Sequence, residues 1–163
     1  VFGEKIKNPE PLFKSAGFSF EYHYRPSPKQ LRKIYASCDI YLCPSWYEGL
    51  GMPAMEAMAC RCALVTVDTG GCRDYAIHDK TALISPTRQV SALASNLSTI
   101  IQDLSLRQRL AENGFQKIQG LKIRAEGAAE NLRDIRLFEI RVKGFLEFYS
   151  GVGNPLRRRE RII

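Results

Sequence analysis

The segment DIYLCPSWYEGLGMPAMEAMACRCALVTV, residues 39–67, decides the fold of this chain. It contains two short apolar runs, 39–43 and 63–67, separated by a glycine-containing loop at 44–51 and a helix-forming stretch at 53–60. Short apolar runs bounded by turn residues are typical of buried strands, and strands joined through a helix pair side by side in parallel. The segment therefore predicts a strand–loop–helix–strand unit of a parallel sheet.

The flanking residues continue this alternation. Three further strands are predicted from apolar runs, at 1–3, 18–24 and 82–84, and a loop is predicted at 68–73. Leucine and isoleucine at helical spacing predict helices at 93–104 and 106–115. Strands that are apolar on both faces and alternate with helices predict an α/β fold, a Rossmann-like doubly wound parallel sheet. Ligands bind at the carboxyl ends of the strands in such sheets.

One helix start has strong local signals. Ser27 is placed as the N-cap, Pro28 stands at the first helical position, and Gln30 can close a capping box. The apolar stripe of this helix consists of Leu31, Ile34 and Tyr35.

Length and composition indicate one globular domain with a basic extension. The chain has 163 residues, of which 45% are hydrophobic, enough for one core. Residues 1–120 are interpreted as the Rossmann-like domain, and 121–163 as a helical segment with a basic tail. The first strand–helix unit is expected upstream of Val1, so the chain is expected to be the C-terminal part of a longer protein. No transmembrane span is predicted.

The net charge of +7 is unevenly distributed, because residues 121–163 hold ten Lys or Arg and six Asp or Glu. The densest run is Arg157, Arg158, Arg159 and Arg161. Such a run can contact acidic lipid at a membrane surface, although terminal charge runs are more commonly solvated. The basic residues do not interleave with aromatic residues as in nucleic-acid-binding surfaces, so no nucleic-acid partner is predicted.

The five cysteines are an odd number, which argues against a disulfide framework and for a reducing, cytoplasmic location. Four of them were weighed as zinc ligands: Cys43, Cys60, Cys62 and Cys72. Their spacing fits no common zinc pattern, so they are predicted to be small buried residues and no metal site is expected.

Glu56 stands alone as a charged residue in the predicted helix 53–60. A buried carboxylate without a partner costs several kcal/mol, so it is expected either to pair or to face a polar ligand. An arginine partner or a backbone amide is the structural alternative.

The loop before this helix contains Gly49-Leu-Gly51. Free N–H groups and the helix dipole favour an anion at a helix N-terminus, and glycine lets a ligand approach the backbone. Glu48 adds a carboxylate that can accept hydrogen bonds from sugar or ribose hydroxyls.

Residues 44–59 resemble the signature of the family 4 retaining glycosyltransferases, also called glycosyl transferases group 1. Glu48 and Glu56 match the Glu-x7-Glu pair of that signature, and the resemblance extends over about residues 1–118. It implies the GT-B architecture, in which two Rossmann-like domains face each other across a cleft. This chain would be the C-terminal, donor-binding domain, and its partner the N-terminal acceptor-binding domain.

The resemblance also implies roles for individual residues. Glu56 would hold the ribose hydroxyls, and Glu48, assigned as the catalytic residue, would contact the transferred sugar. The sugar and diphosphate would lie along the backbone of four residues: Gly49, Leu50, Gly51 and Met52. The base would rest at Tyr24 and Arg25, with Arg25 contributing its backbone.

The implied reaction transfers a sugar from a nucleotide-diphosphate sugar to an acceptor hydroxyl, with retention of configuration. It would serve glycan, polysaccharide or glycolipid synthesis in the cytoplasm or at the inner face of a membrane. No metal or other cofactor is expected. A non-catalytic nucleotide-sugar-binding or regulatory domain of the same fold is the alternative. His23 and His78 are predicted to be structural or solvated.

The sequence departs from the family pattern at several positions. Arg61 stands where the family usually has glycine, and a left-handed conformation costs other residues roughly 1 kcal/mol, so this helix end is expected to differ. Ala63 replaces a common proline, and Asp74 replaces a common glutamate, which weakens any role for Asp74. The family's cationic phosphate ligands would precede Val1, so the chain alone is expected to be inactive.

Overall fold

The computed structural model describes residues 2–3, 21 and 23–131, with side chains at 21 and 23–121. Predictions for residues 18–20, 22 and 132–163, including the basic tail, lie outside the described residues.

The strands form parallel pairs throughout the described residues. They are β1 (Phe2–Gly3), β2 (His23–Tyr24), β3 (Ile40–Cys43), β4 (Ala63–Val67) and β5 (Ala82–Ser85). Hydrogen bonds join β1 to β2 in one sheet, and join β3, β4 and β5, in that order, in another. The predicted parallel α/β fold is confirmed, with its described strands in a two-stranded and a three-stranded group.

Helices follow the strands in the predicted alternation. They are α2 (Pro28–Ala36), α3 (Met52–Ala59), α4 (Val90–Gln102) and α5 (Leu104–Asn131). The capping box of α2 is confirmed, because the Ser27 hydroxyl accepts from the Gln30 N–H and the Gln30 side chain accepts from the Ser27 N–H. A 3-10 helix, η1 (Gly71–Asp74), occupies part of the segment predicted as a loop.

The boundary between α4 and α5 differs from the prediction. Leu104 was assigned to the first helix, but it begins the second. Asp103 is extended and ends α4, and its carboxylate accepts a hydrogen bond from the Leu106 N–H at 2.8 Å. A carboxylate that caps the next helix explains the break at this residue. The predicted domain boundary after residue 120 falls inside α5, which is continuous there, and stays a prediction.

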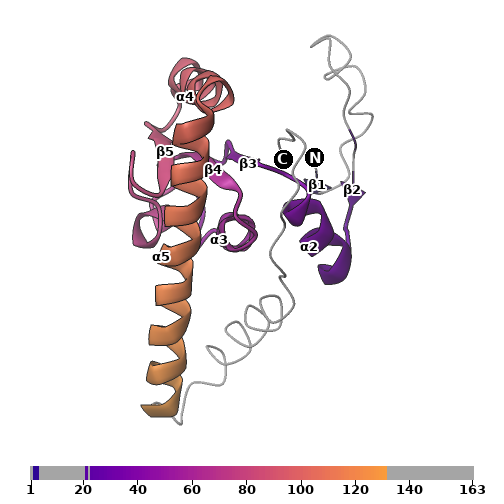
Figure 1. The fold of residues 1–163 in the computed structure, drawn as a ribbon, viewed down its shortest axis with the longest axis vertical. Coiled ribbons are helices and arrows are strands. Elements are labelled where there is room, and N and C mark those ends of the chain that lie inside the picture. Colours follow the sequence, from indigo (N-terminus) through magenta and orange to yellow (C-terminus); the bar gives the residue numbers. More distant parts are fainter. Residues whose placement is uncertain (1, 4–20, 22, 132–163) are drawn as a thin grey trace.

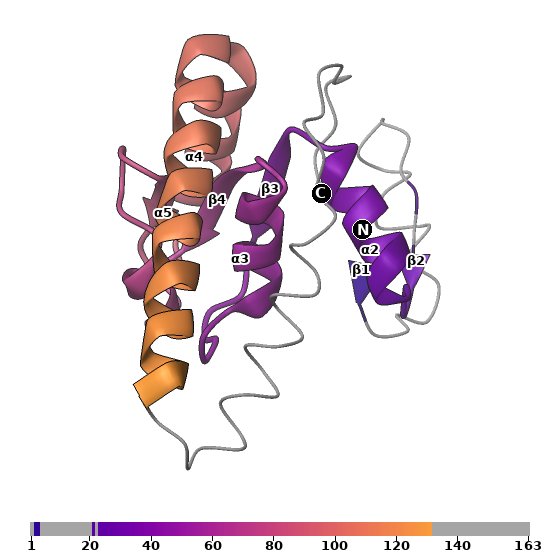
Figure 2. The same cartoon turned by 60° about the horizontal axis from the view of Figure 1, so that its bottom comes forward.

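Helices cover both faces of the three-stranded sheet (Figure 1). One core cluster joins Tyr41 and Leu64 of the sheet to α2, α3 and Ile118 of α5. The other joins Ile40 and Val65 to α4 and the start of α5. Adjacent strand residues thus point to opposite buried faces, as in a doubly wound sheet. Figure 2 shows α3 between the β1, β2 and α2 group and α5.

All five cysteines are free and buried, as predicted for small core residues. No helix among the described residues is long and apolar enough to span a membrane.

The expectation that the end of α3 would differ at Arg61 is wrong. Arg61 adopts the left-handed conformation, with φ of 62°. The Arg61 N–H donates to the Met58 carbonyl and the Cys62 N–H to the Ala57 carbonyl, each at 3.0 Å, which is the Schellman pattern that usually takes glycine. Helix α5 supplies the compensation. The Arg61 Nε lies 3.0 Å from Glu112 Oε2, and its guanidinium stacks 3.6 Å from the Phe115 ring centroid.

Two substitutions at Arg61 separate strain from contact. Arg61→Ala removes the contacts with α5 and keeps the left-handed strain, whereas Arg61→Gly removes both. We expect the glycine variant to be more stable than the alanine variant by about 1 kcal/mol, measured as the free energy of unfolding in urea. Equal stabilities would show that the backbone at this position is unstrained.

Candidate functional site

Two loops meet at the carboxyl edge of the sheet, residues 44–51 after β3 and residues 68–75 after β4. The Glu48 N–H donates to the Thr69 carbonyl at 3.4 Å, and Glu48 and Gly70 form an isolated parallel bridge. Gly71 lies directly against Gly49, since a Cβ on Gly71 would overlap the Gly49 carbonyl oxygen. The second loop therefore fixes the backbone of the loop that carries Glu48.

Gly51 begins α3 in a left-handed conformation, with φ of 69°. The buried Tyr75 hydroxyl donates to the Gly51 carbonyl at 3.3 Å. A Cβ on Gly51 would lie 2.5 Å from that hydroxyl oxygen, so both the dihedral angle and the available space require glycine. No side chain caps this N-terminus, which leaves its free amides suited to an anion.

Glu56 is half-buried in α3, whose other residues are apolar. The Tyr35 hydroxyl of α2 donates to its Oε2 at 3.3 Å. Burial raises the pKa of Glu56, and the hydrogen bond from Tyr35 opposes that rise. The partner found is thus a neutral hydroxyl, and the arginine alternative is not observed for Glu56 among residues 2–3, 21 and 23–131.

The two glutamates flank one buried phenol. Burial raises the pKa of Tyr41, and both Glu48 and Glu56 add to the rise. Burial likewise raises the pKa of Tyr75, with smaller contributions that include Glu48. Because these Coulombic effects act at short range, Glu48 and Glu56 lie close to the same group of tyrosines. The structure brings the predicted pair together.

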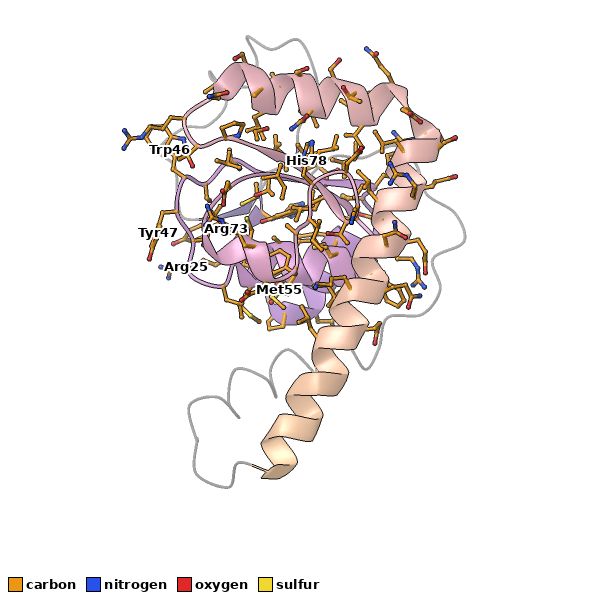
Figure 3. The ribbon with its side chains drawn as sticks, turned by 90° about the vertical axis from the view of Figure 1, so that its left-hand side faces the viewer. Arg25, Trp46, Tyr47, Met55, Arg73 and His78 are labelled. Atoms are coloured by element: carbon orange, nitrogen blue, oxygen red, sulfur yellow. The ribbon has the colours of Figure 1, made fainter. Side chains whose placement is uncertain are left out.

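The predicted base-binding residues end β2. Tyr24 is half-exposed, and the Arg25 guanidinium carbon lies 5.5 Å from the Tyr24 ring centroid. Arg25 has φ of 44°. Figure 3 shows Arg25 on the same side of the molecule as Trp46 and Tyr47 of the loop before Glu48.

The remaining predicted residues divide into exposed and structural ones. Leu50 is exposed and Met52 half-buried. Asp74 is exposed. His23 lies on a strand, and the His78 Nδ1 accepts from the Ile84 N–H at 2.9 Å, which confirms a structural role for His78.

Sequence analysis missed three tyrosines that support the site. Tyr35 appeared only as part of an apolar stripe, and Tyr41 and Tyr75 only as strand and loop residues. A phenol among aliphatic core residues was the available signal, because a buried hydroxyl needs a hydrogen-bond partner. The partner itself could not be read from the sequence.

The fold and these loops define a Rossmann-like ligand-binding domain, with its site at the carboxyl edge of a parallel sheet. The chain belongs to the family described as glycosyl transferases group 1, whose profile matches residues 18–117, more than half of the chain.

Curated relatives and a solved structure agree with this family. The uncharacterized glycosyltransferase YqgM of Bacillus subtilis is 34% identical over 55% of this chain and 25% of its own length. The N,N'-diacetylbacillosaminyl-diphospho-undecaprenol alpha-1,3-N-acetylgalactosaminyltransferase of Campylobacter jejuni is 31% identical over 71% of this chain and 31% of its own length. The chain thus spans about a quarter to a third of these relatives.

The solved structure is the C-terminal domain of a glycosyl transferase group 1 family protein from Francisella tularensis. It superposes with a TM-score of 0.60 at 27% identity, covering 68% of this chain and 58% of that domain. The predicted fold, the C-terminal half of a GT-B glycosyltransferase, is confirmed.

Proposed function

We propose that this chain is the donor-binding domain of a retaining glycosyltransferase that uses a nucleotide-diphosphate sugar. Glu56 carries the proposal, as a half-buried carboxylate in an apolar helix, held by the Tyr35 hydroxyl. Such a carboxylate is rarely tolerated unless it faces a polar ligand, and ribose hydroxyls are suitable donors.

The surrounding geometry assigns the other parts of the donor. The diphosphate would accept hydrogen bonds at the uncapped N-terminus of α3, along the backbone of 49–52. Glu48, placed beside it, would act on the transferred sugar as the catalytic residue. Tyr24 and Arg25 would hold the base. Chemistry would rest on positioning and charge stabilisation, without a metal ion.

The whole protein would add an N-terminal domain that binds the acceptor hydroxyl. The product would be a glycan, polysaccharide or glycolipid, with a hexose as the transferred sugar. The location would be cytoplasmic, and the basic tail would contact the inner face of a membrane.

Thermal unfolding of the intact protein with UDP-, GDP- and ADP-sugars tests this function. One nucleotide series should raise the Tm, because a ligand at one hundred times its Kd adds about 2.7 kcal/mol to stability. Duplex DNA and single-stranded RNA serve as the control for non-specific binding through charge. Stabilisation by nucleic acid and by none of the nucleotide sugars would contradict the proposal.

A further inference from the structure

We propose that Tyr35 is a positioning residue for the donor site. Its buried hydroxyl keeps the Glu56 carboxylate ionised and oriented to accept hydrogen bonds from the ribose. The inference rests on the proposed function and adds to it a residue that no signature motif contains.

The Tyr35 ring is fixed on several sides. It has no exposed surface, and it packs edge-on against the Tyr41 ring at a centroid distance of 5.8 Å and an interplanar angle of 72°. Its own carbonyl accepts a hydrogen bond from the Cys62 thiol at 3.2 Å. Its helix starts at a closed capping box. The hydroxyl therefore occupies a defined position opposite α3.

This position restricts the carboxylate of Glu56. The Tyr35 hydroxyl donates to Oε2 across two elements that are 21 residues apart in the chain. A held Oε2 fixes the carboxylate plane, so that the remaining lone pairs point in a set direction. Preorganised acceptors bind a diol more tightly than mobile ones, because less side-chain entropy is lost on binding.

The same hydrogen bond controls ionisation. Two titratable groups face Glu56 from the elements packed against α3, namely Tyr35 from α2 and Tyr41 from β3. Burial raises the pKa of both phenols, so both stay neutral at physiological pH. Burial also raises the pKa of Glu56, while the Tyr35 hydroxyl lowers it. Loss of that hydroxyl should therefore leave Glu56 protonated at a higher pH than in the wild-type protein.

The test is the pH profile of nucleoside-diphosphate binding by the intact Tyr35→Phe variant, measured by calorimetry from pH 5 to pH 8 with the nucleotide that stabilises the protein best. We expect the acidic limb of the profile to move to higher pH. Affinity should fall about 10-fold relative to wild type near pH 6, and much less at pH 8, since one pKa unit changes the ionised fraction up to tenfold.

Tyr75→Phe is the matched control. It also removes a buried hydroxyl that donates to α3, but the acceptor is the Gly51 carbonyl, which does not titrate. Its effect on binding should be the same at every pH. If Tyr35→Phe lowers affinity equally at pH 6 and pH 8, Tyr35 is merely structural and the inference is wrong.

Glu56→Gln distinguishes this failure from a failure of the proposed function. If Glu56→Gln binds the nucleotide as tightly as wild type, the site assignment itself fails. If Glu56→Gln binds weakly at all pH values and Tyr35→Phe shows the shifted limb, both the site and the positioning role hold.

Discussion

Replacing Gly71 by alanine should destabilise the protein by about 1–3 kcal/mol, the usual cost of overpacking, and abolish nucleotide-sugar binding. A Cβ at this position would overlap the Gly49 carbonyl oxygen and lie 2.9 Å from the Glu48 carbonyl oxygen. Both obstacles are backbone, so neither can rotate away. The loops must separate, and Glu48 moves with the first of them. Urea unfolding and calorimetric binding measure the two effects.

Gly49→Ala is the control for Gly71→Ala. It adds the same methyl group to the facing loop, but its Cβ would have nothing within 4 Å. We expect its free energy of unfolding to stay within about 0.5 kcal/mol of wild type, as for surface substitutions. Equal stabilities of the Gly49→Ala and Gly71→Ala variants would disprove the close packing of the two loops.

Replacing Glu56 by glutamine should weaken nucleotide-sugar binding about 10- to 100-fold and also stabilise the ligand-free protein. Hydrogen bonds to charged groups contribute about 1.5–3 kcal/mol, which sets the loss of affinity. Glu56→Ala should behave similarly in binding. Asp74→Ala, an exposed carboxylate on the neighbouring loop, should weaken binding less than Glu56→Ala, and equal effects would contradict the assignment of Glu56.

The gain in stability follows from the raised pKa of Glu56. The folded state binds the Glu56 proton more tightly than the unfolded chain does, so its advantage is complete below the unfolded pKa and is lost as pH rises through the folded pKa. At neutral pH the full cost of the buried charge is present, and glutamine removes it. We expect a gain of about 0.5–1 kcal/mol at pH 7.5 that vanishes near pH 4.

Glu112→Gln gives the opposite sign. Hydrogen bonds from Gln116 and Arg61 lower the pKa of Glu112, so its stabilising contribution is present above the unfolded pKa and is lost as pH falls. The Tm of this variant should drop at pH 7.5, with nucleotide-sugar binding unchanged. A Tm change of the same sign in the Glu56→Gln and Glu112→Gln variants would contradict the difference between the two environments.

Much of the fold could be predicted because its signals are local. The strand 63–67 has the predicted bounds, and the predicted strand 39–43 and helix 53–60 agree with β3 and α3 to within one residue. The N-terminus of α2 follows from Ser27, Pro28 and Gln30 alone. In each case hydrophobic pattern and capping chemistry favour the same structure.

The parts that could not be predicted depend on contacts between distant residues. Arg61 is tolerated at the end of α3 because Glu112 and Phe115 reach it from α5. The Tyr35 hydroxyl finds Glu56, and Gly71 finds Gly49, only once the loops and helices have packed. The 3-10 helix at 71–74 is a single turn, too short to leave a periodic pattern.

The most direct test of the central claim is a crystal structure of the intact protein with the nucleoside diphosphate that raises its Tm most. The account predicts that the ribose hydroxyls donate to the Glu56 carboxylate, with the diphosphate against the amides of 49–52 at the N-terminus of α3. A nucleotide bound elsewhere, with Glu56 contacting no part of it, would contradict the account.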